Sequence, residues 1–196
     1  MQKPINPTES TLEALNAARA KHTAKFSSAR INLFAAAAFT AVNIILMAAG
    51  SFSYFLFSFT VPYTIAQLGM YLTGSLPAEY YTDWGEGAFL GSGFLIGTMI
   101  AAAVIIGLFV LCGILSKKNR VWLTVALVLF AIDCAFMLYV TLSGGFEASV
   151  IIDIAFHAWV MYYLASGVKS AKALSELPDD SFFGTAEAAD DPQSNG

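Results

Sequence analysis

The polar residues that could do chemistry in this chain are few, and they lie inside long apolar segments. Asp133 is the only charged residue of the segment 121–142, and Asp153 and His157 stand four residues apart in the segment 148–168. A spacing of four puts two side chains on one face of a helix. Because membrane proton relays are built from Asp, Glu and His, these residues are candidates for handling a proton or a cation.

Asp133 and His157 are predicted to meet at one depth in a membrane. The short loop 143–147 joins the segments that carry them, so the two helices should be antiparallel neighbours, and each residue stands twelve positions from the middle of that loop. At about 1.5 Å per residue, both should lie roughly 12–14 Å below the outer hydrocarbon boundary. Asn43, counted from the other end of the first apolar segment, reaches a similar depth and is predicted to lie near them.

Two interpretations of this polar layer are open. Ionisable groups near the midplane cost about 2.5–3.5 kcal/mol on insertion scales, so Asp133 and His157 should face the bundle interior and pair. Such a pair is either a structural clamp that fixes the register of two helices or a site that handles protons or cations. In the second case Asp153, one turn nearer the outer surface than His157, should line the route from the layer to that surface.

Patterns for catalysis or cofactor binding are weak. One intramembrane His and two Asp offer too few ligands for a metal ion, at no recognisable spacing. The other histidine, His22, precedes the first apolar segment, which argues against a haem held by two His. We therefore expect no enzymatic activity, no cofactor, no metal ion and no nucleic-acid partner.

The elements that must position these residues are segments long enough to cross a membrane. Of the 196 residues, 57% are hydrophobic and 12% are charged, against about a quarter charged in an average soluble domain. A transmembrane helix needs about 20 predominantly apolar residues. Four segments meet this requirement: 31–49, 88–115, 121–142 and 148–168.

The distribution of Lys and Arg predicts the orientation of these spans. Five of the ten basic residues precede residue 31, three lie in 116–120 and two follow residue 168. Cytoplasmic loops collect Lys and Arg, and four spans place all ten on one side. Both termini are therefore expected in the cytoplasm.

The segment 54–72 is long enough to cross, but Pro62 and several polar residues interrupt it. If it crossed, five basic residues would lie outside, so we predict that it does not, and a fifth span is the alternative. Proline within a helix kinks or breaks it, and the aromatic residues of 52–84 suit the headgroup level. We expect two short helices in, or dipping into, the outer leaflet, as a plug for the bundle or as a lid over an outward-facing cavity.

The two ends of the chain are predicted to lie outside the bundle. Residues 1–30 should form a cytoplasmic amphipathic helix that begins at the capping box Ser10-Thr11-Leu12-Glu13. Residues 169–196 turn acidic and are poor in large apolar residues. Such a composition is typical of a disordered tail, here on the cytoplasmic side.

Small residues recur in the segment 88–115, where Gly93, Gly97 and Ala101 are four residues apart. A stripe of this kind lets helix backbones approach closely in lipid. Packing within the chain is the default expectation. The alternative is a homodimer or a contact with a membrane-protein partner.

Three stretches carry a resemblance to other proteins. They are Arg30-Ile31-Asn32-Leu33, the run Ser53-Tyr54-Phe55-Leu56-Phe57-Ser58 that leads to Val61-Pro62-Tyr63, and the stretch from Asp153 through His157-Ala158-Trp159 to Tyr162-Tyr163. They resemble a group of small multi-pass membrane proteins of Gram-positive bacteria, over roughly residues 15–174. The resemblance implies a bacterial plasma membrane. Because the group carries no assigned activity, it implies no catalytic residue.

The sequence thus predicts an all-α membrane protein with four transmembrane helices and an additional non-spanning, broken helical segment on the outer side. The expected function is that of a non-enzymatic binding, accessory or scaffold protein that associates with the lipid bilayer. The alternative is a small ion- or proton-coupled transporter or channel component that uses the buried Asp/His layer.

Overall fold

The computed structural model describes residues 7–51, 57–81, 89–144 and 148–178. Within these ranges the secondary structure is helical and contains no strand, which confirms the predicted all-α class. The elements in chain order are α1 (Pro7–Ala48), α2 (Thr60–Leu72), the short 3-10 helix η1 (Ala78–Tyr81), α3 (Ser92–Leu115), α4 (Val121–Gly144) and α5 (Ala148–Glu176).

Four of these helices, α1, α3, α4 and α5, are long and apolar enough to cross a membrane. Their outward faces carry large exposed apolar side chains such as Ile45, Ile100 and Ile132. Contiguous exposed apolar surface is rare on soluble monomers, whereas lipid tails are as apolar as these side chains. The helices therefore agree with the predicted membrane location.

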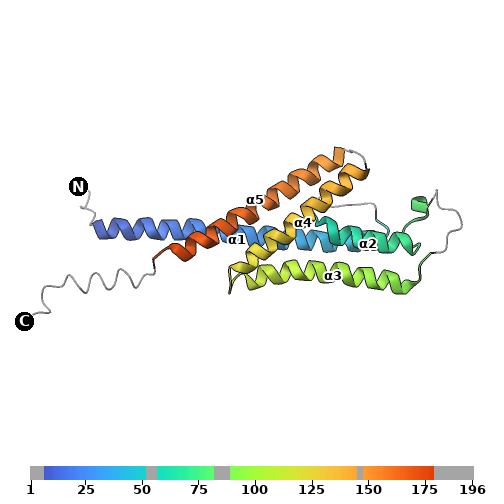
Figure 1. Ribbon diagram of the computed structural model, residues 1–196, viewed down its shortest axis with the longest axis horizontal. Helices are drawn as coiled ribbons and strands as arrows, with labels where there is room; N and C mark the ends of the chain where they lie inside the picture. The colour runs from blue at the N-terminus through green and yellow to red at the C-terminus, as the bar shows by residue number, and fades with distance from the viewer. Residues whose placement is uncertain (1–6, 52–56, 82–88, 145–147, 179–196) are drawn as a thin grey trace, which may run out of the picture.

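Close contacts at one end of the bundle hold α1, α3 and α5 together. A Cβ added to Gly167 of α5 would lie 2.4 Å from the Cβ of Ala29 in α1, so the two backbones touch there. At the same end, Nε of Arg30 donates to the carbonyl oxygen of Gly113 at 2.9 Å, close to the C-terminus of α3. A cation at the negative end of a helix dipole is favourable. From this Arg30 end, α5 and its neighbour α4 lean away from α1 toward the opposite end (Figure 1).

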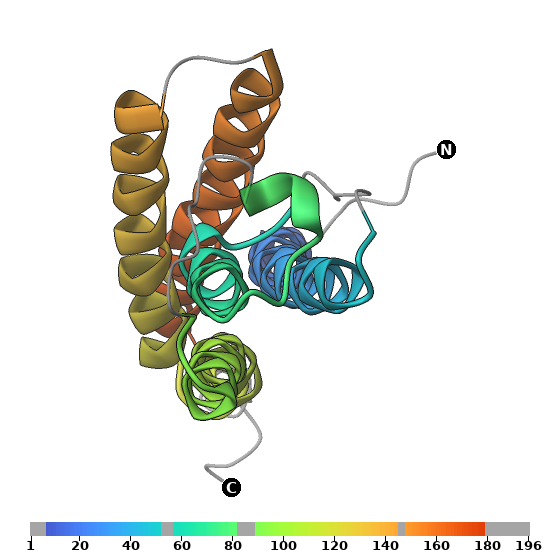
Figure 2. The same ribbon diagram turned by 90° about the vertical axis from the view of Figure 1, so that its right-hand side faces the viewer.

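The helix α2 lies within the bundle. It packs against α1, α3 and α4 (Figure 2). On the α3 side Gly69 meets Thr98, and Ala66 and Met70 form a small core with Ala102. With 13 residues at about 1.5 Å each, α2 is too short to cross roughly 30 Å of hydrocarbon.

The break predicted at Pro62 is absent. α2 is one continuous helix, and Pro62 is its third residue. A proline there costs nothing, because the N–H groups of the first turn have no partner within the helix. Pro62 therefore belongs to the start of a helix and does not interrupt one. Residues 57–59 before it are not helical, and residues 52–56 lie outside the described part.

The helices at both ends of the chain extend across the predicted domain limits. α1 begins at Pro7, before the capping box at Ser10, and continues without interruption into the first span, so 1–30 is not a separate helix. α5 continues to Glu176 instead of ending at residue 168. Its last part contains good helix formers and neither Gly nor Pro, so nothing local stops it. Residues 179–196 of the predicted tail lie outside the described residues.

The small-residue stripe of α3 faces away from the other described residues. Gly93, Gly97 and Ala101 are exposed, and a Cβ added to either glycine would meet no atom of the described residues within 4 Å. The expectation that the stripe packs within the chain is therefore wrong. Another face of α3, which includes Thr98 and Ala102, receives α2.

Candidate functional site

The helix α2 begins against the side chain of Asp133 in α4. The N–H of Thr60 donates to Oδ2 of Asp133 at 3.0 Å, and the N–H of Val61 donates to Oδ1 at 2.8 Å. Both carboxylate oxygens are thus engaged by the first turn of one helix. This position stabilises a carboxylate, because the N–H groups at a helix start lack intrahelical partners and the helix dipole is positive there.

The remaining groups of the first turn are satisfied as well. The N–H of Phe59, the N-cap residue, donates to Oγ1 of Thr40 in α1 at 2.7 Å, and that hydroxyl donates to the carbonyl oxygen of Ala36 at 2.7 Å. Pro62 has no N–H to satisfy. Each unsatisfied backbone group in hydrocarbon costs several kcal/mol. Thr40, Asp133 and Pro62 together therefore allow a helix to start deep inside the bundle.

His157 of α5 completes the cluster. Its Nδ1 lies 2.8 Å from the carbonyl oxygen of Asp153, and because a carbonyl only accepts, Nδ1 carries a hydrogen. Its Nε2 lies 3.3 Å from Oδ2 of Asp133 and 3.3 Å from Oγ1 of Thr60. The predicted contact between Asp133 and His157 is therefore present, and α2 joins it through Thr60.

Aromatic rings enclose these polar groups. Phe59 stacks on Phe109 with ring centroids 4.1 Å apart, and Phe130 stacks on the imidazole of His157 at 5.5 Å. The side chains of Asp133 and His157 are only 2% and 3% exposed. Polar groups removed from solvent to this degree need hydrogen-bond partners, and the cluster provides them.

The other two predicted site residues, Asn43 and Asp153, lie on α1 and α5, two of the helices that contribute to the cluster. Asn43 is buried in α1, three residues after Thr40 and so on the same face of that helix. Asp153 is half-buried one turn before His157. Its backbone carbonyl orients the imidazole, whereas its carboxylate makes no hydrogen bond or ion pair with a described residue. A role of Asp153 in lining a route remains a prediction.

The chain matches no protein-family model, no curated protein and no solved structure.

Chemically, the cluster can share a proton between a carboxylate and an imidazole, because Oδ2 of Asp133 and Nε2 of His157 face each other. The hydroxyl of Thr60 is a third group within reach of the same nitrogen. Among the described residues, no group of three or more His, Cys, Asp or Glu is placed to hold a metal ion.

The part that sequence reasoning missed is the backbone of α2 as the partner of Asp133. A signal for it exists, since Ser58 and Thr60 stand just before Pro62. Ser or Thr followed closely by Pro is typical of a helix start. Interpreting Pro62 as a break placed the helix start elsewhere and hid this contact.

Proposed function

We propose that this protein is a non-enzymatic binding or accessory protein of a bacterial plasma membrane, in which Asp133 and His157 clamp the short helix α2 inside a four-helix bundle. The observation that carries this proposal is the pair of backbone N–H groups bound by the Asp133 carboxylate. A residue that carries an ion must release its partners in every cycle. Here the partners are the main chain of the fold, so releasing them would undock a helix.

The position of Asp133 also favours a structural clamp rather than a substrate-binding site. In secondary transporters, interrupted helices near the midplane point their N-termini at anionic groups of the substrate. In this chain the corresponding place at the start of α2 is filled by the chain's own carboxylate. An anionic substrate would have to displace Asp133 from both N–H groups.

We infer that both termini lie in the cytoplasm. The ten basic residues precede α1's apolar part, lie in the α3–α4 loop or follow the apolar part of α5, and cytoplasmic segments collect such residues. With this orientation, the chain enters the bundle from the outer side before α2, and α2 leads it back to the outer side. Backbone of this kind is tolerated at membrane depth where it is buried in protein, as α2 is.

For the partner surface, we propose the outward stripe Gly93, Gly97 and Ala101 of α3. Small residues allow a second copy or another membrane helix to approach closely, and the two glycines are unobstructed. α2 packs on another face of α3. The clamp at Asp133, which holds α2, therefore also helps to hold α3 in position.

The second candidate function is an ion- or proton-coupled transporter or channel component. It is favoured by the position of Nε2 of His157, which is 3.3 Å from both Oδ2 of Asp133 and Oγ1 of Thr60. A carboxylate and an imidazole that face each other at this distance can exchange a proton. Asp153, one turn away, would continue such a route.

Flux measurements on reconstituted vesicles separate the two functions. With a pH-sensitive dye inside and an imposed membrane potential or a Na⁺ or K⁺ gradient, we expect wild-type protein and the double variant Asp133→Asn, His157→Gln to match protein-free vesicles. If the wild type shows proton or cation flux and the double variant does not, the proposal of a clamp is wrong and the transport function takes its place.

A further inference from the structure

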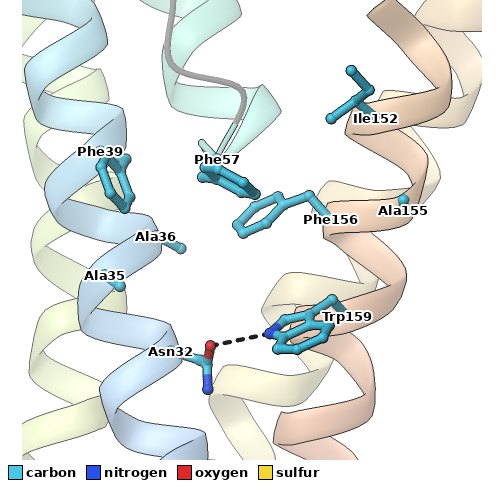
Figure 3. A pocket seen from close by; sticks show the side chains of 9 residues that line it. All are labelled: Asn32, Ala35, Ala36, Phe39, Phe57, Ile152, Ala155, Phe156 and Trp159. Atoms are coloured by element: carbon cyan, nitrogen blue, oxygen red, sulfur yellow. Dashed lines mark hydrogen bonds between the residues drawn. The ribbon is translucent and has the colours of Figure 1, made fainter.

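The seam between α1 and α5 contains an apolar cavity of about 500 Å³ (Figure 3). It lies where the two helices diverge beyond the contact of Gly167 with Ala29. Small side chains such as Ala36 of α1 and Ala155 of α5 leave the space open. Phe57 and Phe156 point toward each other across the gap, with ring centroids 4.9 Å apart.

One end of this cavity is polar. Nε1 of Trp159 donates to Oδ1 of Asn32 at 3.3 Å, and Nδ2 of Asn32 donates to the carbonyl oxygen of Ser28 at 2.9 Å. Trp159 also packs on Tyr163, with ring centroids 5.1 Å apart. This end therefore offers an ordered indole and amide next to apolar walls.

A second, smaller pocket of about 210 Å³ lies along the same two helices. Its lining residues are Ala24, Lys25 and four residues that carry hydroxyl groups, Ser28, Tyr162, Tyr163 and Ser166. On α1, residues 25, 28, 32, 36 and 39 recur at helical spacing and form one stripe that passes from the smaller pocket to the apolar cavity. The cavity and the pocket are thus two ends of a single seam.

Lys25 is the cationic residue of this seam that forms no ion pair with a described residue. Arg30 and Arg120, at the same end of the bundle, donate to the main-chain carbonyls of Gly113 and Ala171. The ammonium of Lys25 forms no ion pair with a described residue and is exposed. It stands six residues before Ile31, where the apolar part of α1 begins, which is about 9 Å along the helix and suits the headgroup level.

We propose that the α1–α5 seam is a binding site for one anionic phospholipid, with an acyl chain in the apolar cavity and its phosphate at Lys25. An apolar cavity beside a smaller pocket whose lining residues include Lys25 matches an amphiphile with an anionic head. The cavity has the size of small-molecule sites, about 300–1,000 Å³. Because it opens on the flank of two spans, membrane lipid is the amphiphile that reaches it. The site is separate from the clamp and does not depend on the proposed function.

Fluorescence quenching by brominated lipid tests this site. The chain has three Trp, so Trp84→Phe with Trp122→Phe leaves Trp159, which lines the cavity, as the reporter. In phosphatidylcholine vesicles with a rising fraction of phosphatidylglycerol brominated on its acyl chains, we expect half-maximal quenching at a mole fraction at least threefold below that of brominated phosphatidylcholine. Quenching that follows bulk mole fraction for both lipids would overturn the proposal.

Matched variants assign the effect to the seam. Ala155→Phe fills the cavity and should remove the preference, whereas Ala158→Phe, also exposed on α5 but outside the cavity lining, should keep it. Lys25→Gln should make both lipids quench equally, and Lys21→Gln should not. If the tryptophan variants do not fold, native mass spectrometry of the wild-type chain and Ala155→Phe serves instead. Equal retention of phosphatidylglycerol by the two proteins would also overturn the proposal.

Discussion

At the residue scale, Asp133 acts as a helix cap supplied by a different helix. The residues around the start of α2 provide no side-chain cap of their own. A carboxylate that binds two backbone N–H groups therefore replaces both the local cap and the water that would bind at an exposed helix end. His157 of α5 then contacts Oδ2 of the same carboxylate through Nε2, and the hydroxyl of Thr60 in α2 contacts that nitrogen. One side chain thus links three helices.

The substitution Asp133→Asn should lower the free energy of unfolding by about 1–3 kcal/mol, the range for leaving a buried group without its partner. Asn keeps the shape of Asp but offers one accepting oxygen and one donating amide. One of the two N–H groups of α2 therefore loses its acceptor. Unfolding in mixed micelles, followed by circular dichroism, measures the change.

The matched control is Asp153→Asn on the neighbouring helix. The carboxylate of Asp153 makes no hydrogen bond or ion pair with the described residues and is half-buried, so we expect a change within about 0.5 kcal/mol. Equal destabilisation by the two substitutions would contradict the cap assigned to Asp133.

At the element scale, α2 depends on a close fit to α3. Gly69 packs against Thr98 so tightly that a Cβ there would lie 1.8 Å from Oγ1 and 2.8 Å from the Cβ of Thr98. Rotation of the threonine side chain moves Oγ1 but not its Cβ, so the conflict with a larger residue remains. The position of α2 is therefore set at its start by Asp133 and along its length by Gly69.

We expect Gly69→Leu to destabilise the protein by about 1–3 kcal/mol through overpacking. Gly107→Leu is the matched control, since it makes the same change on a neighbouring helix where no described atom lies within 4 Å. The control should leave stability unchanged or raise it by up to about 1 kcal/mol, because Leu favours helix more than Gly. The same unfolding assay applies, and an equal or larger loss in Gly107→Leu than in Gly69→Leu would refute this packing.

At the scale of the whole molecule, the bundle is asymmetric from end to end. At the Arg30 end, α1, α3 and α5 are joined by close helix contacts and by Arg30. Toward the other end, α4 and α5 diverge from α1 while α2 occupies the space between α1, α3 and α4 (Figures 1 and 2). Basic residues collect at the Arg30 end, so an oriented membrane position follows from charge and shape together.

Labelling of single introduced cysteines tests this orientation. In intact cells, a membrane-impermeant maleimide should label Tyr80→Cys, because Tyr80 is exposed and lies in the segment between α2 and α3. Ser175→Cys near the end of α5 should react only after permeabilisation. A variant with Cys112 and Cys134 replaced by Ala gives the background. Labelling of Tyr80→Cys from the cytoplasmic side alone would exclude the four-span orientation.

The sequence by itself determined the four apolar helices and the meeting of Asp133 with His157. Span formation depends on local composition over about 20 residues. The depth of each residue depends on its distance along the helix from a shared short loop, and both quantities can be counted in one dimension. For this reason the sequence alone predicts that Asp133 and His157 meet, and the structure places Oδ2 and Nε2 of these residues 3.3 Å apart.

Only the tertiary structure decided where α2 begins, which way the stripe of α3 faces and that a cavity opens between α1 and α5. Pro62 is compatible with a helix break and with a helix start, and the choice depends on Asp133, the acceptor that lies 73 residues after Thr60. A four-residue spacing defines a face of α3 but not its neighbour. The cavity depends on how far two helices diverge from their contact at Gly167. Each of these features is a relation between distant segments, which local patterns of residue type do not determine by themselves.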